Sequence, residues 1–215
     1  MKQLIIAIDG PSGAGKGTIA RTLSEHLGYR HIDTGAMYRA VGWKAIVERI
    51  PLDDEPAVAE LAQRAQIVVE GGVVSIDGHD VTRAIRTPEM DGAAAAVARL
   101  PRVREVLVER QRREGGGGGV VMEGRDIGTV VFPDAEVKVY LNASPEARAR
   151  RRYNELRARG ATVTLEEIIR TETERDQRDA TRSLSPMRPA GDAVVLDSTT
   201  LNIDQVVDAL VKLVR

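Results

Sequence analysis

Short apolar runs alternate along the chain with longer stretches in which apolar positions recur every three or four residues. The short runs are rich in Val, Ile and Leu and predict buried strands at 4–8, 30–32, 119–122, 136–141 and 193–196. The periodic stretches predict helices at 16–27, 36–50, 101–113, 144–158, 165–182 and 203–214. Because this alternation is typical of a parallel sheet covered on both faces, we expect a three-layer α/β fold with a five-stranded parallel sheet.

One segment departs from the alternation. Residues 66–81 contain short apolar pieces separated by two glycine-containing turn signals, between helical patterns at 54–64 and 88–99. Turn signals at this spacing are typical of antiparallel pairing. The segment therefore predicts a small antiparallel insertion outside the parallel sheet.

Polar residues or glycine follow every predicted strand directly. The groups are Asp9-Gly10, Asp33-Thr34-Gly35, Glu123-Gly124-Arg125-Asp126, Asn142 and Asp197-Ser198-Thr199. The carboxyl ends of parallel strands share one edge of the sheet, where open α/β folds bind their ligands. We therefore expect one polar edge that collects all five groups.

The amino-acid composition limits which binding partners and which kinds of site are expected. Lys and Arg number 31 against 32 Asp and Glu, for a formal charge of -1, so the overall field predicts no nucleic-acid or membrane partner. The absence of cysteine excludes disulfides and thiolate metal sites. The apolar run Leu4–Ile8 is shorter than the core of a secretory signal, and no stretch approaches the ~20 residues of a membrane span. We expect a cytoplasmic monomer.

A glycine-rich segment connects the first predicted strand to the first predicted helix, and it reads Gly10-Pro11-Ser12-Gly13-Ala14-Gly15-Lys16-Gly17-Thr18. In this context glycines let backbone N–H groups converge on phosphates, the helix terminus adds positive charge, and the lysine reaches the β and γ phosphates. Gly17 stands where a metal-binding Ser or Thr usually follows the lysine. We therefore expect Mg²⁺ to be carried by ATP without direct ligation by protein.

Two arginines near predicted strand ends are candidates for binding a second phosphate. Phosphoryl transfer spreads charge over several oxygens, so a kinase of small anions needs cationic groups opposite its phosphate loop. Arg39 and Arg125 follow strands expected beside the first one, next to Asp33 and Asp126. Each arginine alone is also compatible with a surface ion pair, but their shared position favours function.

The predicted helix 165–182 and the preceding arginine-rich stretch add further candidates. Arg175, Asp179 and Arg182 share one stripe of the helix, a spacing that a solvated, ion-paired helix explains equally well. The arginines at 148–159, including Arg152, fit a lid that closes over ATP and excludes water. They also fit an ordinary basic surface.

Five motifs together resemble the bacterial cytidylate kinases, within the nucleoside monophosphate kinases that the Gly-Lys-Gly-Thr form resembles. They are Asp-Gly-Pro-Ser-Gly-Ala-Gly-Lys-Gly-Thr at 9–18, Asp-Thr-Gly-Ala-Met-Tyr-Arg at 33–39, Pro-Arg-Val-Arg-Glu at 101–105, Gly-Arg-Asp-Ile-Gly-Thr-Val-Val-Phe-Pro-Asp-Ala at 124–135, and Val-Leu-Asp-Ser-Thr-Thr at 195–200. The resemblance implies a P-loop kinase that uses ATP with Mg²⁺ to phosphorylate CMP or dCMP. It also implies one domain with a core at about 1–50, 101–145 and 190–215, a monophosphate-binding insertion at about 51–100 and a lid at about 146–182.

The resemblance further implies individual roles. Catalysis falls to Lys16, Arg39 and Arg125, and ATP binding to residues 10–18 with Arg152. CMP binding falls to Asp33, Tyr38, Arg39, Arg104, Gly124, Arg125, Asp126, Arg175, Asp179 and Arg182. In this set Arg104 and Asp126 read the base, since arginine can donate to O2 and N3 of cytosine while a carboxylate accepts from N4. Where some members place a serine beside the cytosine amino group, this chain has Ala95.

Two alternatives differ in chemistry. Another P-loop kinase would act on UMP, a different monophosphate or a small alcohol such as shikimate. A non-catalytic ATP-binding module would keep the P-loop without transfer, but Lys16, Arg39 and Arg125 argue against it.

Overall fold

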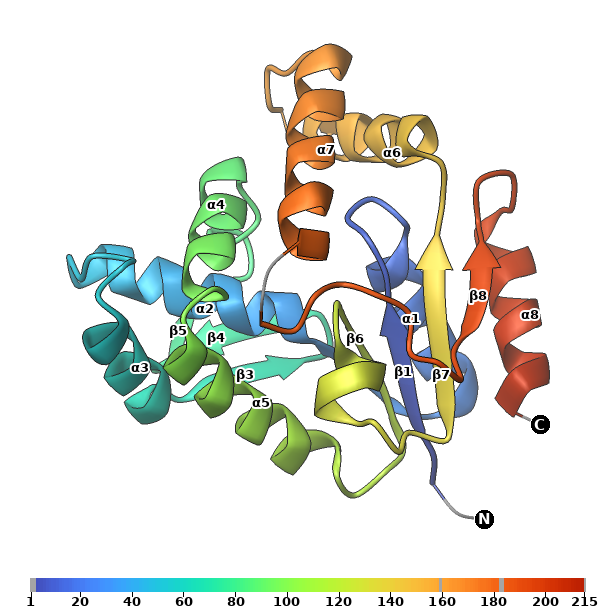
Figure 1. Ribbon diagram of the computed structural model, residues 1–215, viewed down its shortest axis with the longest axis horizontal. Coiled ribbons are helices and arrows are strands. Elements are labelled where there is room, and N and C mark those ends of the chain that lie inside the picture. The colour runs from blue at the N-terminus through green and yellow to red at the C-terminus, as the bar shows by residue number, and fades with distance from the viewer. Residues whose placement is uncertain (1–2, 159, 182–183, 215) are drawn as a thin grey trace.

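The computed structural model describes residues 3–158, 160–181 and 184–214, and Figure 1 shows their arrangement. Along the chain the elements are β1 (Ile5–Asp9), α1 (Lys16–Leu27), β2 (Arg30–Asp33), α2 (Thr34–Val47), α3 (Glu55–Arg64), β3 (Ile67–Glu70), β4 (Val73–Ile76), β5 (His79–Asp80), α4 (Pro88–Val97), α5 (Pro101–Gly115), β6 (Val120–Gly124), the π-helix η1 (Ile127–Val131), β7 (Val137–Asn142), α6 (Pro145–Ala158), α7 (Leu165–Thr181), β8 (Val194–Asp197) and α8 (Ile203–Val214). In this part of the chain, no helix has the length and apolar character to cross a membrane.

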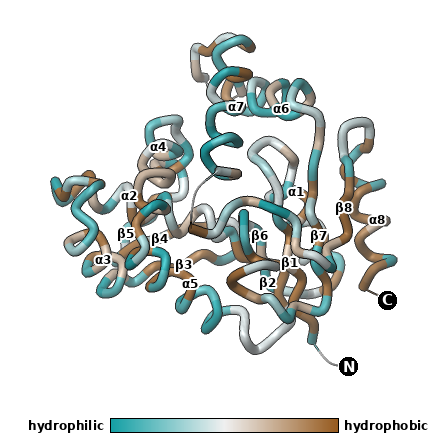
Figure 2. The backbone as a smooth tube through the Cα atoms, viewed as in Figure 1, coloured by the Kyte–Doolittle hydropathy of each residue, from teal (hydrophilic) through white to brown (hydrophobic). Residues whose placement is uncertain are grey.

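The main sheet has five parallel strands in the order β2-β6-β1-β7-β8, as the alternation of strands and helices predicts. Successive side chains of a strand point to opposite faces, and β1 fills both. Ile6 and Ile8 are buried in the cluster formed with α1 and α8, whereas Ala7 is buried in the cluster formed with α2 and α5. Figure 2 shows β1 as apolar and the α6–α7 pair as largely polar. The predicted three-layer α/β fold is confirmed.

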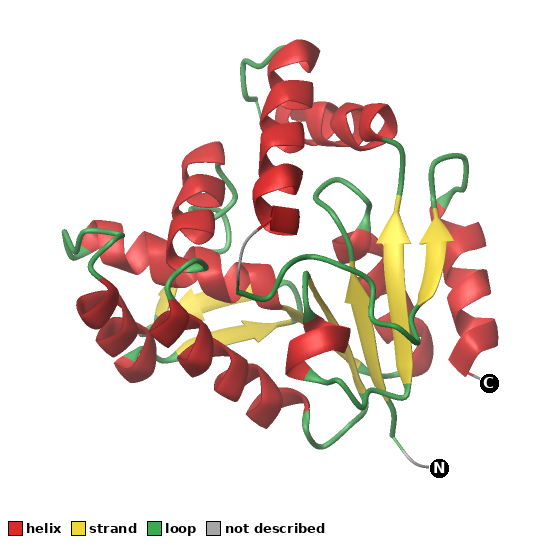
Figure 3. Cartoon of the chain, viewed as in Figure 1, coloured by secondary structure: helices red, strands yellow, loops and turns green. Residues whose placement is uncertain are grey.

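A second, antiparallel sheet of β3, β4 and β5 confirms the predicted small insertion. Figure 3 shows it beside α2, apart from the parallel sheet. Its buried Ile76 and the buried Leu61 of α3 belong to the same apolar cluster as Met37 of α2, so the insertion packs directly on the main core. Helix α4 lies close to α2 because Gly42 has no side chain: a Cβ there would come within 2.9 Å of Ala93.

Helices α6 and α7 project above the carboxyl edge of the sheet (Figure 1). They have a small apolar cluster of their own, centred on Ala149, Leu156 and Ile168. The pair is tied to the glycine-rich loop by Arg148, whose guanidinium donates to the carbonyls of Ala143 at 3.0 Å and of Ser12 at 3.2 Å. These bonds fix the base of the α6–α7 pair beside the glycine-rich loop.

The π-helix η1 has no counterpart among the predicted elements. Its widened turn forms because the carbonyl of Asp126 accepts from the N–H groups of both Val130 and Val131. The buried carboxylate of Asp9, at the end of β1, accepts from the N–H groups of Ile127 and Gly128, each at 2.8 Å. The end of β1 therefore holds the segment that follows Arg125 and Asp126 next to the glycine-rich loop.

Candidate functional site

A cavity of about 710 Å³ lies at the carboxyl edge of the parallel sheet and extends to α4, α6 and α7. That volume is in the range of small-molecule sites. Of the residues predicted for function, those that line it are Ser12, Gly13, Ala14, Gly15, Lys16, Gly17, Thr18, Asp33, Tyr38, Arg39, Arg104, Gly124, Arg125, Asp126, Arg152, Arg175 and Asp179. Gly10 and Pro11 are not in its wall, and the predicted residue Arg182 lies outside the described part of the chain.

The glycine-rich loop, or P-loop, wraps around the amino terminus of α1, which begins at Lys16. Gly10 has a φ of 144°, and a Cβ there would lie 2.0 Å from the carbonyl oxygen of Leu141, so only glycine fits. The Lys16 ammonium is buried and donates to the carbonyl of Pro11 at 2.7 Å. Burial, assisted by the nearby charge of Arg125, lowers the pKa of Lys16 to about 7. A phosphate in the loop would favour the charged form of this lysine and raise its pKa.

Asp33, at the end of β2, binds two guanidinium groups. Its Oδ2 lies 3.1 Å from Arg39 Nη2 and 2.9 Å from Arg86 Nη2, while its Oδ1 caps α2 by accepting from the Ala36 N–H. Although burial favours the neutral acid, the two arginines hold the pKa of Asp33 below its usual range. The carboxylate therefore stays charged and orients Arg39 at the cavity wall.

Arg104 of α5 and Asp126 form a buried ion pair within the same cavity. The Arg104 guanidinium also lies 5.8 Å from the centre of the Tyr38 ring, within the range of a cation–π contact. A fixed donor group and a fixed acceptor group thus stand side by side beside an aromatic ring. Such a set can read the hydrogen-bonding edge of a planar base.

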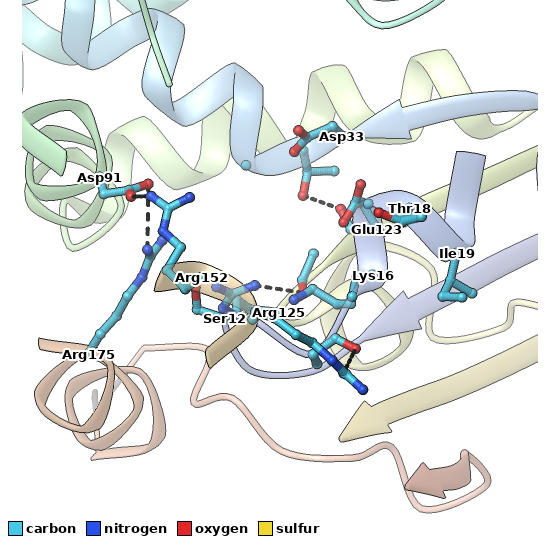
Figure 4. Close-up of a pocket in the computed structure, with 18 of the residues that line it drawn as sticks. Ser12, Lys16, Thr18, Ile19, Asp33, Asp91, Glu123, Arg125, Arg152 and Arg175 are labelled. Atoms are coloured by element: carbon cyan, nitrogen blue, oxygen red, sulfur yellow. Dashed lines mark hydrogen bonds and ion pairs between the residues drawn. The ribbon is translucent and has the colours of Figure 1, made fainter. Parts of the chain in front are cut away.

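Arg125 faces the P-loop from the end of β6 (Figure 4). Its Nε lies 3.2 Å from Asp179 Oδ2 of α7, and its Nη1 donates to the Gly124 carbonyl at 3.3 Å. Burial opposes the charged form, but Asp179, Asp176 and Glu172 together raise the pKa of Arg125. This arginine is a permanent positive charge close to Lys16.

Glu123 is a lining residue to which the sequence analysis gave no role. Its carboxylate is buried, lies 3.0 Å from His31 Nε2, and would be 3.2 Å from a Cβ placed on Gly17. It therefore lies above the position where other P-loops carry a metal-binding hydroxyl. With the hydroxyl of Thr18, also in the wall, it supplies the oxygen donors that Mg²⁺ prefers.

An apolar wall beside the P-loop was also missed. It combines the lining residues Ile19, Leu201, Ile203 and Val206. Arg151 borders it, donating to the carbonyls of Ala14 at 3.2 Å and Ser198 at 2.6 Å. The periodic pattern of 203–214 predicts a helix, and the first turn of that helix also faces the cavity. The sequence feature that indicates a site here is Asp197-Ser198-Thr199, a polar group at the end of a strand.

Arg86 and Asp91 are charged residues of the insertion that also line the cavity. No sequence motif marks either of them as a candidate site residue. Neither follows a strand of the parallel sheet, and neither belongs to a spaced motif. Only the packing of α4 on α2 and the approach of α6 and α7 bring them to the cavity.

Comparison with known proteins finds relatives that match this chain over nearly its whole length. The family described as cytidylate kinase matches residues 6–215. A cytidylate kinase of Pelotomaculum thermopropionicum is 53% identical over 211 residues, 96% of this chain and 93% of that protein. A cytidylate kinase of Desulforamulus reducens is 52% identical over 209 residues, 96% of this chain and 94% of that protein.

Among solved structures, an uncharacterized protein from Eubacterium ventriosum has a TM-score of 0.54 and 13% identity, with 98% of this chain and 97% of that chain covered. At this identity the likeness shows the fold alone. The family match and the relatives at about half identity cover nearly the whole chain. The chain therefore belongs to the cytidylate kinase family.

Proposed function

We propose an arrangement of the two substrates of this kinase, which transfers the γ-phosphoryl group of ATP to CMP or dCMP and yields ADP with CDP or dCDP. One observation carries the proposal. Lys16, Arg39 and Arg125 follow three different strands, yet all line one cavity. A triphosphate at Lys16 would thus face guanidinium groups that can hold a second phosphate.

ATP occupies the P-loop end. Backbone N–H groups of the loop and the amino terminus of α1 bind the β and γ phosphates, with Lys16 and Arg152 as cationic partners. The apolar wall of Leu201, Ile203 and Val206 suits the faces of an adenine ring. The α6–α7 pair acts as the lid, and residues 51–100 act as the monophosphate-binding insertion.

CMP occupies the opposite end, with its base at Arg104 and Asp126. Arginine donates to O2 and N3 of cytosine and the carboxylate accepts from N4, whereas uracil presents O4 and a protonated N3 at those points. Ala94, Ala95 and Ala98 also line the cavity, and their side chains offer no hydrogen bond. Discrimination against UMP therefore depends on the Arg104 and Asp126 pair.

The acceptor phosphate lies between Arg39 and Arg125, with Arg182 as a third ligand, and the ribose lies at Arg175 and Asp179. Charge that develops on the transferring phosphoryl oxygens meets guanidinium groups that carboxylates already orient. Asp33 and Asp179 hold Arg39 and Arg125, at 3.1 and 3.2 Å. The catalytic contribution is thus positioning and charge stabilisation, with no covalent intermediate on the protein.

The kinase family implies a divalent metal ion that accompanies ATP, and we propose Mg²⁺. Glu123 and Thr18 would hold it through its water ligands, a donor set that fits the preference of Mg²⁺ for oxygen. The ion would supply charge neutralisation to the β and γ phosphates. Because Gly17 offers no hydroxyl, direct ligation by the residue after the lysine is not part of the proposal.

We further propose that one chain in the cytoplasm suffices for activity, because the residues assigned to both substrates come from a single chain. Light scattering during size exclusion should give the mass of one chain. A larger mass that persists on dilution would contradict this part of the proposal.

A coupled assay of ADP formation with CMP, dCMP, UMP, AMP and shikimate tests the acceptor. We expect turnover with CMP and dCMP, slower turnover with UMP, and none with AMP or shikimate, because only cytosine satisfies Arg104 and Asp126 together. Equal rates with UMP and CMP would contradict the base assignment.

A further inference from the structure

Asp91, in the first turn of α4, meets arginines from three other elements of the structure. Its Oδ2 forms an ion pair with Arg152 of α6. Its Oδ1 lies 3.5 Å from Arg175 Nη1 of α7 and 3.7 Å from Arg39 Nη1 of α2. Figure 4 shows Arg152 and Arg175 converging on this carboxylate. One aspartate thus connects the insertion to both helices of the α6–α7 pair.

Positive charge is concentrated around Asp91. Three guanidinium groups approach this carboxylate, and the four side chains are only 12–19% exposed. Two of these arginines have one further carboxylate partner each, Asp33 for Arg39 and Glu155 for Arg152. Like charges in such a weakly solvated site repel one another strongly, so an anion among them lowers the energy of the assembly. A single carboxylate supplies one negative charge, whereas a phosphate group supplies more charge and three acceptor oxygens.

The Asp91 carboxylate lies in the cavity that is proposed to bind the nucleotides. Asp91, Arg39, Arg152 and Arg175 all line the cavity in which we place the phosphates of both nucleotides. The carboxylate therefore occupies the arginine cluster in the way that a substrate phosphate would. Both cannot satisfy the same N–H groups at once.

We propose that Asp91 is an internal stand-in for a substrate phosphate: it holds the α6–α7 pair against α4 while the site is empty and gives up its arginines when nucleotide phosphates arrive. This inference rests on the proposed function, which assigns Arg39 and Arg152 to phosphates and Arg175 to the ribose of the acceptor. Asp91 therefore competes with substrates and products, weakening their binding while keeping the empty site partly closed.

The test uses Asp91→Asn, which keeps the shape and removes the charge. Glu89→Gln is the matched control. Glu89 is exposed in the same helical turn, and its substitution by Gln removes the same charge as Asp91→Asn. Calorimetry with pyrophosphate and with ATP should show dissociation constants about three- to tenfold lower for Asp91→Asn than for wild type. Glu89→Gln should match wild type, and Asp91→Glu should stay near it because the carboxylate is retained.

A distance measurement completes the test. The chain has no cysteine, so Arg99→Cys, at an exposed position directly after α4, and Glu174→Cys, on the exposed face of α7, accept spin labels without competition. Without nucleotide, the α4–α7 distance should be short in wild type and longer or broader in Asp91→Asn. ATP with CMP should bring both proteins to the same short distance.

Two outcomes overturn the inference. An Asp91→Asn protein that binds pyrophosphate and ATP no more tightly than wild type would show that the carboxylate does not compete with phosphates. An unchanged distance in the empty variant would show that it does not hold the helices together. Should Asp91→Asn unfold, Asp91→Ala is measured by the same criteria.

A separate variant, Arg39→Ala, tests the proposed function. Arg39→Ala should weaken CMP binding if this arginine holds the acceptor phosphate. Unchanged CMP binding in Arg39→Ala would contradict that assignment, whatever Asp91→Asn does.

Discussion

At the scale of single residues, arginines of the cavity already have carboxylate partners before a nucleotide binds. Arg39 pairs with Asp33, Arg104 with Asp126 and Arg125 with Asp179. Each pair fixes a guanidinium group that would otherwise sample many rotamers, so less entropy is lost when a phosphate or base arrives. Such preorientation is what stabilisation of a transition state requires.

Arg125 is the residue whose loss should affect the chemical step most selectively. We expect Arg125→Ala to lower kcat by about two decades or more, since a cation that faces the transferring phosphoryl group is lost. Arg125→Lys should recover part of that loss. Steady-state kinetics with CMP measures both, with Arg113→Ala as control because Arg113 is exposed and outside the cavity. Wild-type kcat in Arg125→Ala would show that this arginine is not a clamp.

Lys16 should make ATP binding depend on pH. Its pKa is lowered to about 7 in the empty site by burial and by Arg125, whereas bound phosphates favour the charged ammonium and raise that pKa. Above about pH 7, binding must therefore take up a proton, and affinity should fall as pH rises. Calorimetry in buffers of different ionisation enthalpy should detect the uptake at about pH 8 in wild type and not in Lys16→Met. No uptake in wild type would contradict the assigned pKa.

At the scale of elements, the π-helix η1 places Arg125 and Asp126 through its bonds to Asp9. Burial raises the pKa of Asp9 to about 6 from an ordinary 3.8, although two N–H groups favour its ionised form. Between these values the folded chain holds a proton that the unfolded chain has lost. The stability contributed by this group is therefore complete below about pH 4 and is lost as pH rises to about 6.

Asp9→Asn removes this titration. The free energy of unfolding of wild type minus that of Asp9→Asn should fall by about 2 kcal/mol between about pH 4 and pH 7, as the pKa difference requires. Urea unfolding at several pH values gives the difference and cancels the titration of other groups. Parallel pH profiles for the two proteins would mean that Asp9 is not titrating as assigned.

The sequence predicted most elements because their patterns are local. The apolar run 136–141 and the polar residues after it do not depend on what packs against them, and β7 lies at Val137–Asn142. The turn signals of 66–81 likewise predicted the antiparallel sheet. By contrast, the π-helix at Ile127–Val131 depends on a distant carboxylate, Asp9, so no local pattern announces it.

The residues of the candidate site likewise fall into those that the sequence predicts and those that it does not. The P-loop, Arg39 and Arg125 could be found because strand ends of a parallel sheet converge. Arg86 and Asp91 could not, because they reach the cavity only through the packing of α4 on α2 and beneath α6 and α7. The apolar wall of Leu201, Ile203 and Val206 could not be predicted either, because apolar residues at helical spacing predict packing equally well.

At the scale of the whole molecule, the cavity is bounded by three bodies: the edge of the parallel sheet, the insertion with α4, and the α6–α7 pair (Figure 1). Direct transfer requires both nucleotides inside it at the same time, with water kept from the γ phosphate. The sheet edge supplies the groups at the strand ends, whereas the insertion and the α6–α7 pair supply Asp91, Arg152 and Arg175. We therefore expect enclosure of two substrates to depend on all three bodies and not on one residue.

The central claim is that ATP at Lys16 and CMP at Arg39 and Arg125 occupy this cavity together, ready for direct transfer. A crystal structure with CMP and a non-hydrolysable ATP analogue measures this most directly. It should place the γ phosphorus about 3–3.5 Å from an oxygen of the CMP phosphate, with cytosine at Arg104 and Asp126. A CMP molecule bound away from Arg39 and Arg125, with its phosphate beyond reach of the γ phosphate, would contradict the account.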